Sequence, residues 1–175
     1  AYAKDPKRVQ AYIRRAVILR TRLKRQEDAD RCIEEMVRAN PGEPEAEIAR
    51  IRYARETRGA GLPKDEYLGI LSELIQKHGH KVPELYLLAA QLEHEDGKVE
   101  AARNLLMQGQ QRHPEEVSFP RELARLDLQE GRRQEALAIL RGLIDRLPPT
   151  SNDYWVTIEL LLEAGEMEQV EKLIS

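Results

Sequence analysis

Two histidines one residue apart, His78 and His80, are the side chains whose spacing comes nearest to that of a metal site. A protein-bound metal ion needs three or four ligands together with partners that orient them. No third ligand lies near this pair in the sequence, and the pair falls where a helix is expected to end. We therefore interpret the two histidines as part of an ordinary loop, with no metal ion.

The single cysteine, Cys32, is the next candidate for chemistry, because a thiol activated by a histidine is a nucleophile. The histidine nearest to it in the sequence is His78, and Cys32 lies among apolar residues such as Ile33 and Met36. It is predicted to be a small buried side chain. The GAG sequence at 59–61 is too short for a dinucleotide-binding turn. We predict no enzyme activity and no cofactor.

The composition favours helices over strands. Of 175 residues, 34% are charged and 5% aromatic, which is unfavourable for a β-sandwich or barrel. One cysteine excludes an internal disulfide, and no run approaches the ~18 apolar residues of a membrane span. We expect a helical protein without a membrane segment and place it in the cytoplasm, with the periplasm as the alternative.

A period of 34 residues runs through the second half of the chain. Three residue types return at that spacing: Gly97, Gly131 and Gly165; Ala102 and Ala136; Pro114 and Pro148. Self-similarity at a fixed period is typical of repeat proteins, in which each unit buries its apolar face against its neighbours.

Each period predicts two helices. Leu85, Leu88 and Leu92 form one apolar stripe at helical spacing, and a glycine that can adopt a left-handed conformation, Gly97, follows. Small residues such as Gly109 in the second helix allow close packing. Extended backwards, the pattern predicts one array over residues 1–175 with five units: 8–41, 43–80 (divergent, with an insertion near 58–63), 83–115, 117–149 and 151–175 (incomplete).

The last unit is expected to stop partway through its second helix, with Leu173 and Ile174 unshielded. Because solenoid ends usually carry a polar capping helix, we expect that the chain continues in a longer protein or that this end docks on something. Self-association through this open end is one such possibility.

The chain resembles the tetratricopeptide repeat (TPR) family, which has the same 34-residue helix–turn–helix unit. The matching residues are Tyr86, Ala90, Gly97, Ala102 and Pro114 in the third unit; Leu123, Ala124, Gly131, Ala136 and Pro148 in the fourth; Tyr154 and Gly165 in the fifth; and Ala29, Ile33 and Pro41 in the first. The first unit departs from the pattern with Lys24 at the turn glycine. A weaker likeness, to the half-a-TPR repeats of RNA-processing scaffolds, rests on residues 51–60 and 101–106.

The TPR resemblance implies an all-α, right-handed solenoid whose concave groove, lined by the first helix of each unit, binds protein segments. By that analogy the groove residues are Arg14, Arg15, Arg22, Gln91, His94, Arg121, Arg125 and Trp155. Arg121 and Arg125 either grip a partner's carboxylates or pair with Glu122, Asp127 or Gln129. Trp155 is either a groove anchor or a core side chain. The family's clamp for chaperone tails matches poorly, because Ile18 stands where asparagine is needed.

Charge is distributed unevenly along the chain. Residues 1–25 hold nine basic side chains and one acidic one, a net +8, whereas residues 151–175 hold six acidic side chains and one lysine, a net −5. The basic segment is a solvated helix, a site for an acidic protein or another copy of the chain, or a nucleic-acid site. The predicted function is a non-catalytic protein-interaction scaffold. The alternatives are an RNA-associated scaffold and a structural spacer in a larger protein.

Overall fold

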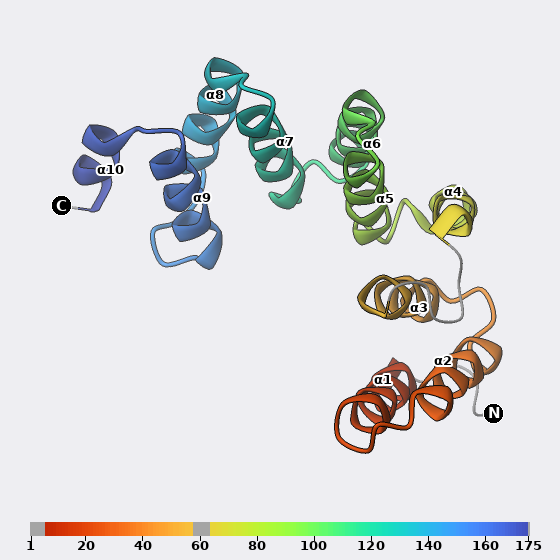
Figure 1. The fold of residues 1–175 in the computed structure, drawn as a ribbon. Helices are drawn as coiled ribbons and strands as arrows, with labels where there is room; N and C mark the ends of the chain where they lie inside the picture. The colour runs from red at the N-terminus through yellow and green to blue at the C-terminus, as the bar shows by residue number, and fades with distance from the viewer. Residues whose placement is uncertain (1–5, 58–63, 175) are drawn as a thin grey trace. The chain divides into compact units, whose positions relative to one another are not determined.

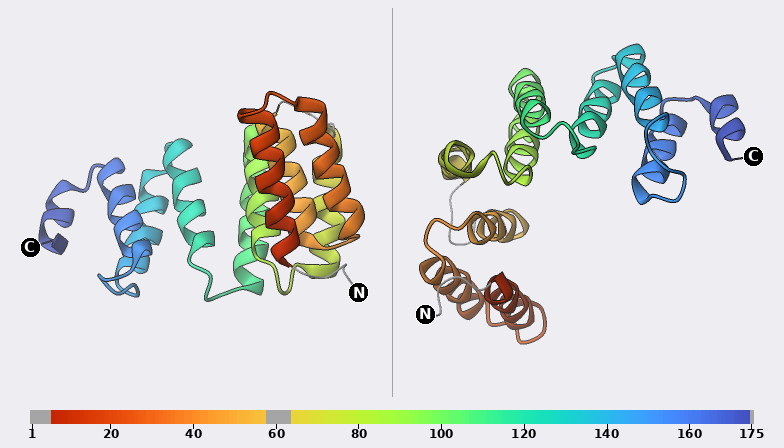
Figure 2. Two further views of the ribbon diagram at one scale, coloured as in Figure 1. Left: turned by 90° about the horizontal axis from the view of Figure 1, so that it is seen from below. Right: turned by 180° about the vertical axis from the view of Figure 1, so that it is seen from behind.

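The computed structural model describes residues 6–57 and 64–174, and these residues form ten α-helices and no strand (Figure 1). The helices are α1 (Pro6–Thr21), α2 (Gln26–Ala39), α3 (Pro44–Glu56), α4 (Lys64–His78), α5 (Glu84–Glu95), α6 (Val99–Arg112), α7 (Ser118–Gln129), α8 (Arg133–Ile144), α9 (Asn152–Glu163) and α10 (Met167–Ile174). Figure 2 shows them from two further sides. The predicted all-α fold of paired helices is confirmed, while the insertion expected near 58–63 lies outside the described residues.

The chain divides into two compact units, Ala1–Leu85 and Tyr86–Ser175. In the first unit, α1, α2 and α3 pack together around a core of aliphatic side chains that includes Val9, Ile33 and Met36. Cys32 belongs to this core, with 1% of its surface exposed. Its burial raises the pKa of the thiol, which therefore stays protonated. The interpretation of Cys32 as a buried side chain is confirmed.

A partly buried polar cluster joins the same three helices. The Arg20 Nη1 atom of α1 lies 3.0 Å from Asp30 Oδ1 of α2 and donates a 3.0 Å hydrogen bond to Tyr53 Oη of α3. The Tyr53 hydroxyl in turn donates to Asp30 Oδ1 over 2.6 Å. Burial, together with this bond to Asp30, raises the pKa of Tyr53 to about 12. The three groups satisfy one another and fix how the helices face each other.

The turn between the two helices of a hairpin has a left-handed backbone. Gly97, Gly131 and Gly165 have φ angles of 75°, 74° and 82°. After α7, for example, the Gly131 N–H bonds to the Leu128 carbonyl and the Arg132 N–H to the Asp127 carbonyl, a pattern that satisfies the last carbonyls of a helix. Lys24 takes this conformation after α1, with φ 58°. A side chain is strained there, and glycine is not.

In the second unit α6 and α7 approach closely at Gly109. A Cβ atom added at Gly109 would lie 2.9 Å from Phe119 Cδ1 and closer still to Cε1 and Cζ. Phe119 is fully buried, and its ring stacks on His113 at 6.2 Å and meets the edge of Tyr86 at 6.4 Å between ring centroids. The sequence predicted that Gly109 allows close packing. The structure shows that the residue it accommodates belongs to the next hairpin.

Replacing Lys24 by glycine tests the strain in the first turn. Lys24→Gly should raise the free energy of unfolding by about 1 kcal/mol, because glycine adopts positive φ without the Cβ penalty. The reverse change, Gly97→Ala, should lower it by about the same amount, since no atom lies within 4 Å of the added Cβ and only the backbone is tested. Urea denaturation followed by circular dichroism measures both; equal stability of Lys24→Gly and the parent chain would show that this turn is unstrained.

The contact at Gly109 is tested by adding one methyl group. Gly109→Ala should destabilise the chain by about 1–2 kcal/mol, because the overlap with Phe119 outweighs the helix-propensity gain of alanine. Gly142→Ala is the matched control: it is also a helix glycine, with nothing within 4 Å, and should stabilise by up to about 1 kcal/mol. Thermal and urea melts compare the two variants, and a stabilised Gly109→Ala would contradict the close contact between Gly109 and Phe119.

Candidate partner-binding surface

The residues that the sequence assigned to a groove fall into two groups. Arg14, Arg15 and Arg22 belong to the first compact unit, and the others belong to the second: Gln91, His94, Arg121, Arg125 and Trp155.

The three arginines of the first unit are exposed. Arg15 lies 3.6 Å from Glu35 of α2, with more than half of each side chain in solvent, which makes this a weak pair. Arg14 and Arg22 form no ion pair with any residue that the structure describes. Their charge is therefore available to another molecule.

In the second unit, α9 presents a tryptophan to solvent. Trp155 is 48% exposed, whereas its neighbour Tyr154 is 4% exposed and fills the position that packs inside the hairpin. The two rings meet edge to face at 5.6 Å between centroids. The start of α9 is held by Ser151, whose Oγ accepts a 3.1 Å hydrogen bond from the Tyr154 N–H and donates to the Pro148 carbonyl. Trp155 is thus a positioned surface side chain and does not fit the alternative of a core tryptophan.

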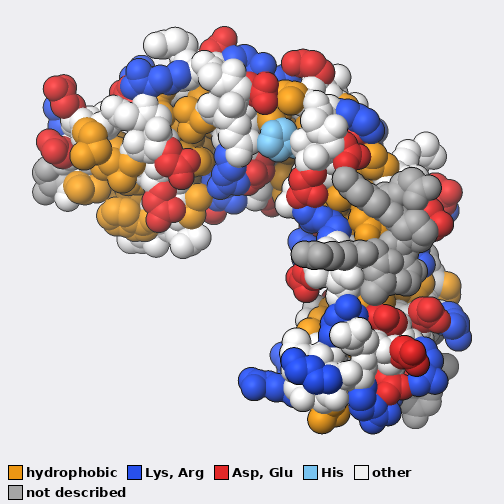
Figure 3. All heavy atoms as spheres, viewed as in Figure 1, with side chains coloured by type: hydrophobic (Ala, Val, Ile, Leu, Met, Phe, Trp, Pro, Cys, Tyr) orange, Lys and Arg blue, Asp and Glu red, His pale blue; other side chains and the backbone are white. Residues whose placement is uncertain are grey.

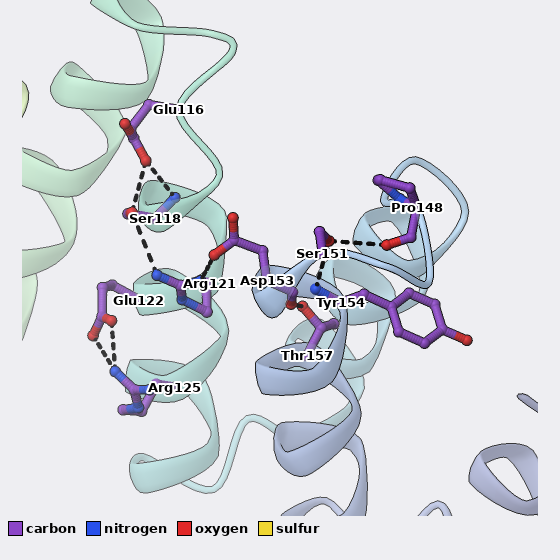
Figure 4. A network of polar contacts seen from close by, with 10 residues as sticks. All are labelled: Glu116, Ser118, Arg121, Glu122, Arg125, Pro148, Ser151, Asp153, Tyr154 and Thr157. Atoms are coloured by element: carbon purple, nitrogen blue, oxygen red, sulfur yellow. Dashed lines mark hydrogen bonds and ion pairs between the residues drawn. The ribbon is translucent and has the colours of Figure 1, made fainter. Parts of the chain in front are cut away.

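Arg121 of α7 is held by the neighbouring first helix, α9 (Figure 4). Its Nη1 lies 2.5 Å from Asp153 Oδ1, and its Nη2 lies 3.4 Å from the Ser118 hydroxyl oxygen. Ser118 donates from both its backbone N–H and its hydroxyl to Glu116. Sequence reasoning did not foresee Asp153 as the partner, because it lies 32 residues further along the chain.

Arg125 lies one turn further along α7 and pairs within its own helix. Its Nη1 lies 2.5 and 2.6 Å from the two oxygens of Glu122, which is one of the partners that the sequence proposed (Figure 4). The pair is accessible, with 40% of the arginine and 35% of the glutamate side chain exposed. Arg121 and Arg125 therefore already engage carboxylates of the chain, and a partner's carboxylate would have to exchange with these acids.

The α5 residues of the proposed surface are polar. Gln91 is exposed and donates to Glu95 one turn later, over 3.1 Å, while His94 is half-buried. This Gln91 contact lies within one turn of its own helix, as that of Arg125 does.

A buried carboxylate beneath this surface was missed by sequence reasoning. Asp127 of α7 has no exposed surface and pairs with Arg103 of α6 and with Arg132, whose Nε lies 2.8 Å from Oδ1. It therefore joins two hairpins and the turn between α7 and α8. The signal was present: Asp127 lies four residues after the buried Leu123, so that a carboxylate stands on an apolar stripe.

No protein-family model matches the chain, and no curated protein matches it. Solved structures resemble it throughout its length. The TPR-like repeats of a kinesin light chain-type protein from Podosopora anserina superpose with a TM-score of 0.61 at 18% identity, covering 98% of this chain and 93% of that one. The MamA protein superposes with a TM-score of 0.58 at 14% identity, covering 97% and 90%.

These similarities establish the fold. The chain has the helical-repeat architecture of TPR proteins, as its 34-residue period and turn glycines predicted. No helix within the described ranges has the length and apolar character needed to cross a bilayer. Over the same residues, no three histidine, cysteine or acidic side chains gather as a metal site would require.

Removing the buried carboxylate tests whether it couples the hairpins. Asp127→Asn should lower the free energy of unfolding by about 2–3 kcal/mol, because it leaves two arginines without their counter-charge; the partial exposure of those arginines keeps the loss below that of a fully buried pair. Asp145→Asn removes the same charge at an exposed position and should change stability by less than about 0.5 kcal/mol. Chemical denaturation measures both, and similar effects at the two positions would contradict a coupling role for Asp127.

Proposed function

We propose that this protein is a non-catalytic scaffold that binds a segment of a partner protein along the first helices of its second unit. The observation that carries the proposal is the exposed face of α9. Trp155, Glu159 and Leu162 lie at helical spacing on one side of it, and the two apolar side chains are 48% and 39% exposed.

The other side of α9 has a different role. Tyr154, Thr157, Ile158, Leu160 and Leu161 are buried within the unit, so the helix already has its packing partners. A tryptophan exposed on such a helix leaves apolar surface in contact with water, which is unfavourable, and it does not contribute to the core. Figure 3 shows hydrophobic side chains gathered over α9 and α10. Tryptophan and arginine are also the residues most enriched at the energetic centres of interfaces.

Arg121 and Arg125 support the same proposal from α7. Each guanidinium is held in place by a carboxylate; the Arg125 side chain is 40% exposed, whereas that of Arg121 is 16% exposed. A guanidinium oriented in advance loses little freedom when it binds a second acceptor. A bound segment would place an apolar residue on Trp155 and acceptors on the arginines, which predicts short motifs that combine the two.

A display library of short random peptides tests the proposal against the purified chain. Trp155→Ala should lower the affinity for the enriched peptides more than tenfold, as expected at an interface hot spot. Met107→Ala is the matched control, because Met107 is 45% exposed on α6, a second helix, and its loss should leave binding within about twofold. Affinities are measured by fluorescence polarisation of labelled peptides.

The salt dependence separates this site from a phosphate-binding surface. An interface anchored on Trp155 should keep most of its affinity at ~300 mM salt, where exposed charges are well screened. A library that yields no specific peptide, or peptides that bind Trp155→Ala as well as the parent chain, would show that this face is not the binding site.

A further inference from the structure

Exposed large hydrophobic side chains are concentrated on the helices near the two ends of the chain. Among the described residues there are eight: Val17, Ile18, Leu23, Met107, Trp155, Leu162, Met167 and Ile174. Three of them belong to α1 or follow it directly, and four belong to α9 and α10. Only Met107 lies elsewhere, so the apolar surface has two locations.

The surface on α1 combines this apolar character with positive charge. Arg14 and Ile18 lie one turn apart on α1, and Arg22 directly follows the last residue of the helix, where its N–H bonds to the Ile18 carbonyl over 3.0 Å. The three side chains therefore follow one side of the segment, with the two arginines about 12 Å apart. Ile18 is 53% exposed and Val17 beside it is 45% exposed. Neither arginine forms an ion pair with a described residue, and both contribute positive charge to this face.

The surface on α9 and α10 combines exposed apolar side chains with negative charge. In α9 an acid, Glu159, stands between the exposed Trp155 and Leu162, and Glu163 follows one turn later. The exposed residues Met167 and Ile174 have the same spacing in α10. Two other acids of residues 151–175, Asp153 and Glu166, already pair with arginines of α7 and α8. Glu159 and Glu163 form no ion pair with a described residue, so the negative charge of this surface comes from α9. Both surfaces therefore expose apolar side chains, and their charges have opposite signs.

We propose that the α1 surface of one copy of this protein binds the α9–α10 surface of a second copy. The two surfaces differ, so the contact is heterologous: each new contact uses one surface of each kind, and the contact itself does not stop association at a dimer. The proposal does not depend on the partner segment proposed above, although both use Trp155, and a bound segment would compete with the second copy.

A second copy fits the α1 surface better than a nucleic acid does. Sites for single-stranded nucleic acid stack bases on aromatic rings, whereas the exposed apolar residues on α1 are aliphatic. The complementary acidic surface is present on every molecule at the same concentration as the basic one. Opposite charges also speed the encounter, which predicts faster association at low salt.

Sedimentation velocity on the purified, nuclease-treated chain tests the proposal without any peptide, so its outcome is independent of the scaffold test. The average mass should rise with concentration beyond that of a dimer and fall as salt is added. A mass that stays monomeric at every concentration overturns the proposal. Association that is present in an untreated sample and absent from the nuclease-treated one overturns the proposal in favour of nucleic acid bound at α1.

Charge reversal identifies the surfaces. Arg14→Glu with Arg22→Glu, and separately Glu159→Arg with Glu163→Arg, should each weaken association more than tenfold, because like charges then face each other. An equimolar mixture of the two variants should associate again, since each then meets its complement. Lys81→Glu with Arg112→Glu is the control: it changes the net charge as much as the first variant at exposed positions outside both surfaces and should leave association within about twofold.

The restored mixture rules out misfolding as the cause of the loss, because an unfolded variant would not recover its partner. Circular dichroism of each variant gives the same control independently. If both variants associate like the parent chain, or if the mixture stays monomeric, the proposal that these two surfaces bind each other is wrong. Ile18→Ser should also weaken association, and Met107→Ser should not, because only the former removes apolar surface at the contact.

Discussion

Each complete hairpin of the second unit depends on one backbone conformation, a residue with positive φ directly after the first helix. Gly97, Gly131 and Gly165 supply it at intervals of 34 residues. The left-handed residue ends the first helix and lets the second begin within two residues, so the turn decides which face of each helix meets the other. The buried stripes and the exposed faces both follow from that register. Lys24 keeps the same turn in the first unit at the cost of a strained side-chain-bearing residue.

Features that depend on local or periodic chemistry could be predicted from the sequence. The turn glycines, the helix ends and the stripe that contains Leu85 and Leu88 follow from backbone sterics and from helical spacing, which act over a few residues. The repeat multiplies each weak signal, because the same residue type recurs at the same distance. Burial of Cys32 was predictable for the same reason, since its apolar neighbours on one helix face had to pack.

Features that depend on which helix lies opposite could not be predicted. The choice of Asp153 over nearer acids as the partner of Arg121 requires the distance between α7 and α9, and the pairing of Asp127 with Arg103 requires that between α6 and α7. Trp155 was ambiguous because adjacent aromatic residues compete for one packing position, and the capped start of α9 assigns that position to Tyr154. For the two ion pairs the distance between helices far apart in the sequence determines the partner, and a single sequence does not give that distance.

The aromatic pair on α9 also provides an intrinsic fluorescence probe. Trp155 is the single tryptophan, and its ring contacts that of Tyr154, whose hydroxyl donates to the Leu173 carbonyl of α10. Glu166, directly before α10, binds Arg133 and Arg141 of α8. Detachment of α10 breaks the bond to Tyr154 and alters the surroundings of the indole. Intrinsic fluorescence therefore reports local opening of α10, without an attached dye and separately from global unfolding.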